Sequence, residues 1–496
     1  MERVRFAPSP TGPLHIGGLR TALFNYLYTK KSKGSFVLRI EDTDKNRKIK
    51  GSEKHIIDSL KWCGLIHDEG PDKGGAYGPY RQSERISIYK QYIKFLLEKG
   101  KAYYAFDSTE ALSDLRSKCE KEGKRFNYGL TNRATLKNSL TMPSEELKAL
   151  MKDKEPYVIR LKIDDGNSIV CSDLLRGPVS FKRKELEDKI LIKEDGFPTY
   201  HFANVVDDYL MKITTVIRGE EWLSSLPIHY ILYKSFNWTP PKFLHLPLIL
   251  NPSGKGKLSK RDSDKNGYPI FPLKWDYNEE AIEGFKDKGF LNEALINYIS
   301  QLGWSFSEKK EIYKLEELIA LFSIEKIQKG GCRFDFEKAK WVNSKHLQLL
   351  TSKEILEVSS ANLKEKFLDY KKDSVGKMIE LVKNRLVLIT DLEELVSVFI
   401  KNPKDFNEKD FNKMNKLGAK KILQELIALI SLTKNKIQKK TLIQYSETQQ
   451  INLGRIMQLM RLALVGSLTG PDIIAVVEVV GINVTLQRLK FLTQKL

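Results

Sequence analysis

The sequence has few cysteines and no long uninterrupted hydrophobic run. Its four cysteines, Cys63, Cys119, Cys171 and Cys332, lie far apart and form no CxxC pair, so neither a disulfide framework nor a zinc ribbon is indicated. No apolar run approaches the roughly 18 residues that a membrane helix requires. The N-terminal MERVRFAPSP carries charges where a signal peptide needs an apolar core. We therefore expect a cytoplasmic protein without a membrane-spanning segment.

Acidic residues are in deficit. Lys and Arg number 83 against 63 Asp and Glu, a formal net charge of +20, so a polyanion is the first partner to consider. The apolar share of 41% and the charged share of 29% are typical of a globular protein rather than a disordered or coiled-coil chain. The chain has 496 residues, about three times the roughly 150 residues of an average domain. Several hydrophobic cores are therefore predicted.

The first hundred residues alternate strand-like and helix-like patterns. A short β-prone run, Val4–Ala7, precedes the turn-rich PSPTGPLHIGG; the amphipathic LRTALFNYLYTKK follows, and then the strand-like SFVLRIE. This order predicts a β-loop-α-β unit, the opening of a doubly wound parallel sheet. Ser52 is expected to cap a further helix, which Gly64 ends.

The pattern changes twice along the chain. The short β-prone runs PYVIRLKI, IVCSD, GPVSF and KILIK predict an inserted α+β module over residues 101–195. The parallel-sheet pattern is expected to resume at Tyr200–Val206 and to continue through KITTVIRGEEW, SLPIHYILYKSF and FLHLPLIL. From about residue 290 the periodicity is helical. The predicted fold is thus α/β with an insertion, followed by an all-α region.

Two loops carry residues suited to phosphate chemistry. The first, APSPTGPLHIGG, follows a predicted strand and opens a helix, where backbone N–H groups and the positive helix end can hold phosphate oxygens. Gly17 and Gly18 would let a nucleotide approach the backbone, and His15 can offer a ring N–H to the same phosphates. Taken alone, the loop is equally well explained as a stiff turn before a helix.

The second loop is KLSKR, Lys257–Arg261, within a segment that also contains Gly254, Gly256 and Gly267. Mobile cations suit a polyphosphate leaving group, on which negative charge develops during phosphoryl or nucleotidyl transfer. Taken alone, a solvated basic loop is the more common explanation.

Together, and in this order, the two loops resemble the HIGH and KMSKS signatures of class I aminoacyl-tRNA synthetases. Within that class, RFAPSPTGPLHIGGLRTALFNYLYTK, LRIEDTD, TYHFANVVDDYLM, VIRGEEW and GKLSKRD resemble glutamyl-tRNA synthetase of the bacterial type. EALINYISQLGW and GRIMQLMRLALVGSLTGPD resemble that family's stem-contact and anticodon-binding regions. The resemblance covers nearly the whole chain.

The resemblance implies a class I Rossmann-type catalytic domain, three further domains, an activity and a set of partners. The implied domains are the two catalytic halves at 1–100 and 196–250, an acceptor-binding insertion at 101–195, a stem-contact domain with the KLSKR loop at 251–345, and an α-helical anticodon-binding region at 346–496. The implied activity is the ATP-dependent attachment of L-glutamate to tRNA(Glu) through a glutamyl-adenylate. The implied partners are ATP, L-glutamate and tRNA(Glu), and we expect a monomer.

The resemblance also implies which residues hold the substrates. Glutamate would be bound by Arg5, Ser9, Glu41, Tyr200, Asn204 and Arg218. ATP would be bound by His15, Gly17, Gly18, Trp222, Lys257 and Lys260, of which His15, Lys257 and Lys260 are the expected catalytic residues. Arg5 and Arg218 can form charge-assisted bonds to the two carboxylates of glutamate, while Glu41 can accept from its ammonium group.

Metal requirements follow from the same comparison of motifs. Mg²⁺ is expected with ATP, where it neutralises phosphate oxygens, but no metal ligand is expected from the protein. The stretch KAYYAFDSTEAL has no cysteine where some relatives carry a zinc module, so no zinc is predicted.

The sequence departs from the family pattern at two places. Gly18 replaces the second histidine of the HIGH form, and the segment after KLSKR looks longer than usual, with no function that we can assign. Arg385 is a possible anticodon reader by position only, and His201 is interpreted as structural.

Three alternatives stay open. A non-discriminating enzyme would also glutamylate tRNA(Gln), a glutaminyl enzyme would carry another form of the first loop, and a catalytically silent paralogue would bind RNA without chemistry. The sequence does not show which third anticodon base is read.

Overall fold

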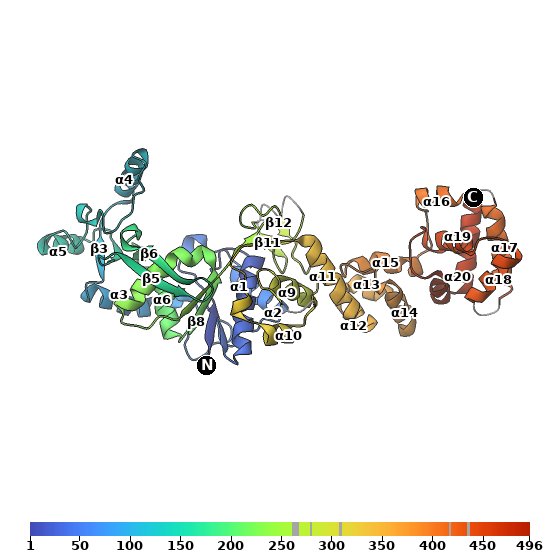
Figure 1. The fold of residues 1–496 in the computed structure, drawn as a ribbon, viewed down its shortest axis with the longest axis horizontal. Coiled ribbons are helices and arrows are strands. Elements are labelled where there is room, and N and C mark those ends of the chain that lie inside the picture. The colour runs from blue at the N-terminus through green and yellow to red at the C-terminus, as the bar shows by residue number, and fades with distance from the viewer. Residues whose placement is uncertain (260–266, 278–279, 307–309, 416–417, 434–436) are drawn as a thin grey trace. The chain divides into compact units, whose positions relative to one another are not determined.

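The computed structural model describes residues 1–259, 267–277, 280–306, 310–415, 418–433 and 437–496 (Figure 1). The chain divides into two units. The first comprises Met1–Asp287 and Leu295–Phe336, and the second comprises Lys288–Ala294 and Glu337–Leu496. The five-part division predicted from the sequence is finer than this one and stays a prediction.

The first unit mixes strands and helices, as predicted for an α/β fold with an insertion. Its elements are β1 (Arg3–Phe6), α1 (Ile16–Lys31), β2 (Ser35–Leu38), α2 (Ser52–Trp62), α3 (Ile86–Glu98), β3 (Ala102–Ala105), α4 (Thr109–Lys121), α5 (Ser144–Lys152), β4 (Val158–Leu161), β5 (Ser168–Asp173), β6 (Gly177–Lys182), β7 (Ile190–Ile192), α6 (Tyr200–Leu210), β8 (Thr215–Gly219), α7 (Leu226–Ser235), β9 (Lys242–Leu246), β10 (Ile249–Leu250), β11 (Trp275–Tyr277), β12 (Glu280–Ile282), α10 (Leu315–Leu321) and β13 (Cys332–Arg333).

Two parallel strand pairs form the centre of this unit. β1 pairs with β2 across helix α1, and β8 pairs with β9 across α7. The amide of Thr214 donates to the carbonyl of Arg3 at 2.8 Å, which places β8 beside β1. Such β-α-β connections leave the carboxyl ends of the strands along one edge, where ligands bind in open α/β sheets.

The inserted segment contributes antiparallel structure. Strands β3, β4 and β7 form one antiparallel sheet, and β5 and β6 form a hairpin. Leu174, just after β5, donates its amide to the carbonyl of Phe243 in β9 at 2.8 Å. The hairpin therefore lies against the parallel pair β8 and β9.

Two local predictions are wrong. Ser52 is not the N-cap of α2: Gly51 takes that position with φ of 88°, and Ser52 is the first helical residue. The segment Tyr200–Val206 belongs to helix α6 rather than to the resumed sheet. Its buried Phe202, Val205 and Val206 follow the i, i+3, i+4 spacing of a helix, and this periodicity overrides the local β propensity of the valines.

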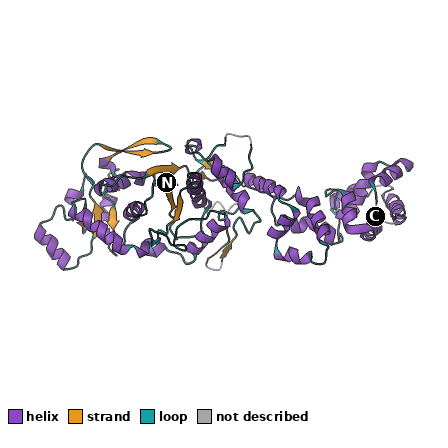
Figure 2. Cartoon of the chain, turned by 90° about the horizontal axis from the view of Figure 1, so that it is seen from below, coloured by secondary structure: helices purple, strands orange, loops and turns teal. Residues whose placement is uncertain are grey.

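The described part of the second unit is helical and contains no strand (Figure 2). Its helices are α11 (Phe336–Leu349, whose first residue belongs to the first unit), α12 (Ser352–Val358), α13 (Ala361–Lys366), α14 (Lys372–Lys383), α15 (Asp391–Ile400), α16 (Glu408–Met414), α17 (Ala419–Ser431), α18 (Lys439–Thr448), α19 (Leu453–Val465) and α20 (Ile473–Lys495). Helix α9 (Asn292–Ser300) begins in this unit and ends in the first. The all-α prediction for the last third of the chain is confirmed, and none of the helices described is long and apolar enough to span a bilayer.

Arg488 joins three parts of the second unit. Its guanidinium donates to the carbonyl oxygens of Val398 at 2.6 Å, Leu464 at 2.7 Å and Lys401 at 2.9 Å, and to the side chain of Asn402 at 3.0 Å. Arg488 is buried. One side chain of α20 thereby satisfies carbonyl groups at the carboxyl ends of α15 and α19, where helices leave such groups without partners.

Replacing Arg488 by methionine should lower the stability of the second unit. The variant removes the donors of three carbonyl groups, of which that of Leu464 is buried, a loss on the order of 3 kcal/mol. Calorimetric unfolding should show the decrease, whereas Lys490→Met, an exposed position on the same helix, should unfold close to the parent. Equal unfolding temperatures for both variants would contradict this role of Arg488.

Candidate functional site

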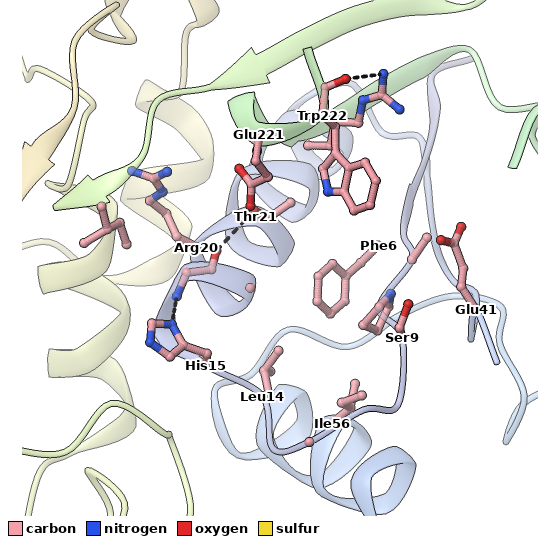
Figure 3. Close-up of a pocket in the computed structure, with 18 of the residues that line it drawn as sticks. Phe6, Ser9, Leu14, His15, Arg20, Thr21, Glu41, Ile56, Glu221 and Trp222 are labelled. Atoms are coloured by element: carbon pink, nitrogen blue, oxygen red, sulfur yellow. Dashed lines mark hydrogen bonds between the residues drawn. The ribbon is translucent and has the colours of Figure 1, made fainter. Parts of the chain in front are cut away.

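A cavity of about 460 Å³ opens in the first unit beside the carboxyl ends of β1 and β8 (Figure 3). It is lined by the loop after β1, the start of α1, helix α6 and the segment after β10. Every predicted site residue that the structure describes lines this cavity: Arg5, Ser9, His15, Gly17, Gly18, Glu41, Tyr200, Asn204, Arg218, Trp222 and Lys257. Lys260 lies outside the described residues. The two loops singled out in the sequence therefore meet at one cavity.

His15 marks the start of helix α1. It is the N-cap residue, and its Nδ1 accepts from the amide of Gly17 at 3.0 Å (Figure 3). Burial, together with the charge of Lys257, lowers the pKa of His15 to about 4, so the ring is neutral at pH 7. Because Nδ1 accepts, the proton of the neutral ring is on Nε2. Nε2 is buried and has no hydrogen-bond partner among the described residues, which makes it a donor available to a ligand.

The position of Gly18 leaves little room for a side chain. A Cβ added at Gly18 would lie 2.9 Å from Cδ1 of Leu14. A histidine at this position, as in the HIGH form of the motif, would therefore displace Leu14 from the packing beneath the loop. The departure from that form has a local steric explanation in this chain.

The opposite end of the cavity is built on a buried charge cluster. Arg5 Nε donates to Asp208 Oδ1 at 3.0 Å, and Arg39 donates to the same oxygen at 2.7 Å and to Glu41 Oε1 at 3.0 Å. Asn204 Nδ2 also donates to Glu41 Oε1, at 2.8 Å. These side chains are buried, so each charge depends on its partners in place of water.

The pKa shifts of the two carboxyl groups have opposite signs. Burial raises the pKa of Glu41, although Arg39 and Arg5 oppose the increase. Burial acts in the same direction on Asp208, but Arg39 and Arg5 outweigh it and lower the pKa of that carboxyl. Asp208 is therefore the fixed counter-ion of both guanidinium groups, and Glu41 is the carboxyl that gains most from a further positive charge.

Arg218 lies in β8 with its guanidinium directed to the cavity. It donates from Nη1 to the hydroxyl of Tyr200 at 2.9 Å and from Nη2 to the carbonyl oxygen of Trp222 at 3.2 Å. The rings of Tyr200 and Trp222 lie 4.2 Å apart. Tyr200, Asn204 and Asp208 are spaced by four residues on α6, so one face of this helix supplies three groups of the site.

The cation of the second loop has a partner in the cavity wall. Lys257 Nζ lies 3.0 Å from Oε1 of Glu221, and both side chains are partly exposed. Figure 3 shows His15 and Glu221 at one end of the cavity and Ser9 and Glu41 at the other. A cationic, N–H-rich end thus stands opposite an end with paired carboxylates and guanidinium groups.

Sequence reasoning assigned no role to Asp208 or Glu221. Both lie in quoted motifs, Asp208 in TYHFANVVDDYLM and Glu221 in VIRGEEW. The sequence signal was the adjacent acidic pair Asp207 and Asp208 in an otherwise apolar helical stretch, because buried carboxylates require cationic partners. No comparable signal distinguishes Glu221 from its neighbour Glu220.

The arrangement suits a ligand pair rather than one small molecule. The start of α1, the Nε2 donor of His15 and Lys257 can bind phosphate oxygens, while Arg5, Arg218 and Glu41 can bind a molecule with carboxylate and ammonium groups. In the part of the chain that the structure describes, no cluster of three or more His, Cys, Asp or Glu could hold a metal ion. The expected absence of zinc stays a prediction.

Comparison with known proteins extends the similarity to the whole chain. Residues 2–341 match the family described as tRNA synthetases class I (E and Q), catalytic domain, and residues 359–492 match the family described as anticodon binding domain. The chain is 44% identical over 493 residues to a glutamate–tRNA ligase from Christiangramia forsetii, covering 98% of each. It is also 44% identical over 491 residues to one from Flavobacterium psychrophilum, again covering 98% of each.

Two solved structures are similar to this chain over nearly its whole length. A crystal structure of a glutamate tRNA ligase from Elizabethkingia meningosepticum in complex with its amino acid superposes with a TM-score of 0.96, at 43% identity, covering 100% of this chain and 99% of that one. A glutamate-tRNA synthetase from Elizabethkingia anophelis gives a TM-score of 0.93 at 43% identity, covering 99% of each.

Acidification should destabilise the folded protein through its buried histidines. The pKa of His15, His201 and His346 is lowered from 6.5 to about 4, with burial as the largest cause. Between these two values the unfolded chain binds protons that the folded chain does not, so the free energy of unfolding falls as the pH falls from 6.5 toward 4. Each group contributes about 1.4 kcal/mol per pH unit within this window.

Urea unfolding at pH 7.5, 6.5 and 5.5 measures this dependence. The decrease between pH 6.5 and 5.5 should be smaller in His346→Gln, which removes one of these titrating groups and does not line the cavity. An unfolding free energy that does not change with pH in the parent protein would contradict the expectation.

Proposed function

Because the chain belongs to the class I tRNA synthetases for glutamate and glutamine, and among them to the glutamate–tRNA ligases, we propose that it attaches L-glutamate to tRNA(Glu) through a glutamyl-adenylate formed from ATP. The observation that carries this proposal is the convergence of the first loop, Lys257 and the glutamate-binding side chains on one cavity.

Arg5, Arg218 and Glu41 are the central glutamate-binding groups in this proposal. Both arginines are buried at the cavity wall, where a charge-assisted bond to a carboxylate contributes about 1.5–3 kcal/mol. Replacing a carboxylate by an amide loses much of that gain, which corresponds to about one to two decades of selectivity for glutamate over glutamine. Arg39 and Asn204 both donate to Oε1 of Glu41, so we assign its Oε2 to the ammonium group.

Adenylate formation needs positioning and charge stabilisation rather than a general base. An oxygen of the α-carboxylate, already ionised, attacks the α-phosphorus of ATP; the bond to the β-phosphate oxygen breaks and pyrophosphate leaves. The neutral His15 donates from Nε2 to the phosphates, and Lys257 moves from Glu221 to the developing negative charge. Lys260 is assigned to the same phosphates, Gly17 and Gly18 to close backbone approach, and Trp222 to the nucleotide side.

The second step transfers glutamate to RNA. A ribose hydroxyl at the tRNA terminus attacks the acyl carbon, AMP leaves with the electron pair of the broken mixed-anhydride bond, and the hydroxyl proton passes to a phosphate oxygen of the departing AMP. Mg²⁺ bound with ATP would neutralise charge on the phosphates. The cavity fits such an ion because Lys257 and the start of α1 would not occupy every phosphate oxygen. Helices of the second unit would hold the anticodon, in keeping with the family match over residues 359–492.

We further propose that the protein acts as a monomer in the cytoplasm. Its four cysteines are free thiols, and burial raises the pKa of Cys171 to about 12 and that of Cys63 further. Such thiols are unreactive and suit a reducing compartment. Arg385 stays a candidate anticodon reader.

The activity is tested by glutamate-dependent exchange of pyrophosphate into ATP, with and without tRNA. We expect exchange that requires tRNA, followed by charging of tRNA(Glu) in preference to tRNA(Gln) when each is supplied separately. Exchange absent under both conditions would favour a silent RNA-binding paralogue. Equal charging of the two tRNAs would replace the proposal by the non-discriminating enzyme.

Substituting Arg218 by alanine should affect glutamate far more than ATP. Loss of a charge-assisted contact predicts an increase in the KM for glutamate of about ten- to a hundredfold, while the KM for ATP changes little. Steady-state exchange at varied glutamate and varied ATP measures both values. A parallel rise of both would point to a collapsed cavity and against a specific substrate contact.

A further inference from the structure

Two buried residues stand behind Arg218, outside the cavity lining. His245 lies opposite Arg218 in the parallel register of β8 and β9, and Asp173 ends strand β5 of the inserted hairpin. His245 and Asp173 are almost fully buried, with 0% and 2% of their surface exposed. Neither residue lines the cavity, and their burial leaves them no direct contact with a substrate.

The three side chains form a continuous series of hydrogen bonds. Arg218 Nε donates to His245 Nε2 at 2.9 Å, and His245 Nδ1 lies 2.7 Å from Asp173 Oδ2. A guanidinium N–H can only donate, so Nε2 of His245 must accept, and the ring proton must be on Nδ1, where it donates to Asp173. Only the neutral Nδ1–H form of His245 satisfies both contacts. Burial lowers the pKa of His245 although Asp173 opposes the decrease, which is consistent with a neutral ring.

Asp173 fixes this tautomer because every group it meets is a donor. Oδ2 accepts from the amide of His245 at 3.0 Å as well as from its ring, and Oδ1 accepts from the amides of Leu175 at 3.0 Å and Arg176 at 2.9 Å. Burial would raise the pKa of Asp173, but the bonds from His245 and the backbone outweigh it and lower the pKa. An ionised carboxylate is thus matched on both oxygens, and an amide in its place would oppose donor to donor in either orientation.

The series determines how Arg218 is presented. With Nε held by His245, the guanidinium plane is fixed from behind, and Nη1 and Nη2 reach Tyr200 and the carbonyl of Trp222 at the cavity. The ring of Phe243 lies nearly parallel to that of His245, with the centroids 6.3 Å apart and an interplanar angle of 11°. A planar fork binds a carboxylate well only when its orientation is set in advance.

We propose that Asp173 and His245 are positioning residues that hold Arg218 in the orientation required to bind a carboxylate of glutamate. The proposal rests on the substrate role given to Arg218 above. It makes the hairpin of the inserted segment a part of amino-acid recognition, since the carboxylate that begins the series belongs to β5.

Asp173→Asn tests the proposal with little change in volume. Two backbone amides donate to Oδ1, so the amide oxygen of asparagine is expected at that position with its N–H₂ facing His245. This orientation favours the Nε2–H form of the ring, which places that N–H against the N–H of Arg218, as in other sites where a buried carboxylate sets a histidine tautomer. We expect the KM for glutamate in tRNA-dependent exchange to rise about tenfold or more, the equivalent of one lost charge-assisted bond, with the KM for ATP within about twofold of the parent.

Asp188→Asn is the matched control. Asp188 is also a fully buried carboxylate of the inserted segment, and it accepts from the Tyr103 hydroxyl at 2.8 Å, from Arg133 at 3.0 Å and from the amide of Ile163 at 3.1 Å. Its replacement should lower the unfolding temperature as Asp173→Asn does, yet leave both KM values unchanged. A role of Asp173 in folding alone would make the two variants alike.

A second pair of variants keeps the test decisive if Asp173→Asn does not fold. His245→Gln retains an oxygen that can accept from Arg218 and an N–H₂ that can donate to Asp173, whereas His245→Leu retains neither. We expect the glutamine variant to keep a KM for glutamate close to the parent and the leucine variant to raise it about tenfold or more.

The outcomes separate this proposal from the one on which it rests. If Arg218→Ala raises the KM for glutamate but Asp173→Asn and His245→Leu do not, the positioning role is overturned and the role of Arg218 stands. If Arg218→Ala itself leaves that KM unchanged, the substrate contact is refuted first, and the positioning role with it.

Discussion

The ionic cluster under the end of the cavity that Ser9 and Glu41 line is the constraint on which the site depends. Arg5, Arg39, Glu41 and Asp208 are almost entirely withdrawn from water, and unpaired charges in such surroundings would cost several kcal/mol each. The cluster joins β1, the segment after β2 and helix α6. Elements far apart in the sequence must therefore come together before any of these charges can be buried, and the assembled cluster leaves Arg5 and Glu41 at the surface of the cavity.

This dependence explains the division of tasks within α6. Tyr200, Asn204 and Asp208 recur at the period of one helical face. One face of α6 therefore supplies both lining residues of the cavity, Tyr200 and Asn204, and the carboxylate that neutralises Arg5 and Arg39. The neighbouring carboxylate, Asp207, also lies 4.0 Å from Arg39, but its hydrogen bonds come from other residues: Arg85 at 2.7 Å, Gln82 at 2.9 Å and the Tyr89 hydroxyl at 2.7 Å. Adjacent acidic residues thus have separate structural roles because successive positions of a helix point in different directions.

Much of the fold and the site could be predicted from the sequence, for identifiable reasons. Hydrophobic periodicity gave β1, α1, β2 and the helices of the last third, and the comparisons confirm the family that the motifs resemble. The segment Tyr200–Val206 was misassigned because its valines favour strands locally, and residues 202–208 are all buried in the helix, so burial there gives no amphipathic pattern. The cap of α2 was misassigned because a serine is a common N-cap, whereas Gly51 adopts a positive φ there. Asp208, Asp173 and His245 were not identified because partners across β-strand registers and between a helix and a strand leave no fixed spacing in a sequence.

The two ring nitrogens of His15 have different roles: Nδ1 caps the first turn of α1, and Nε2 is buried without a hydrogen-bond partner among the described residues. The hydrogen bond that caps the start of α1 also prevents the imidazole from rotating. The direction of this donor is therefore fixed when the chain folds, so a ligand that accepted from it would cost little conformational entropy at this contact.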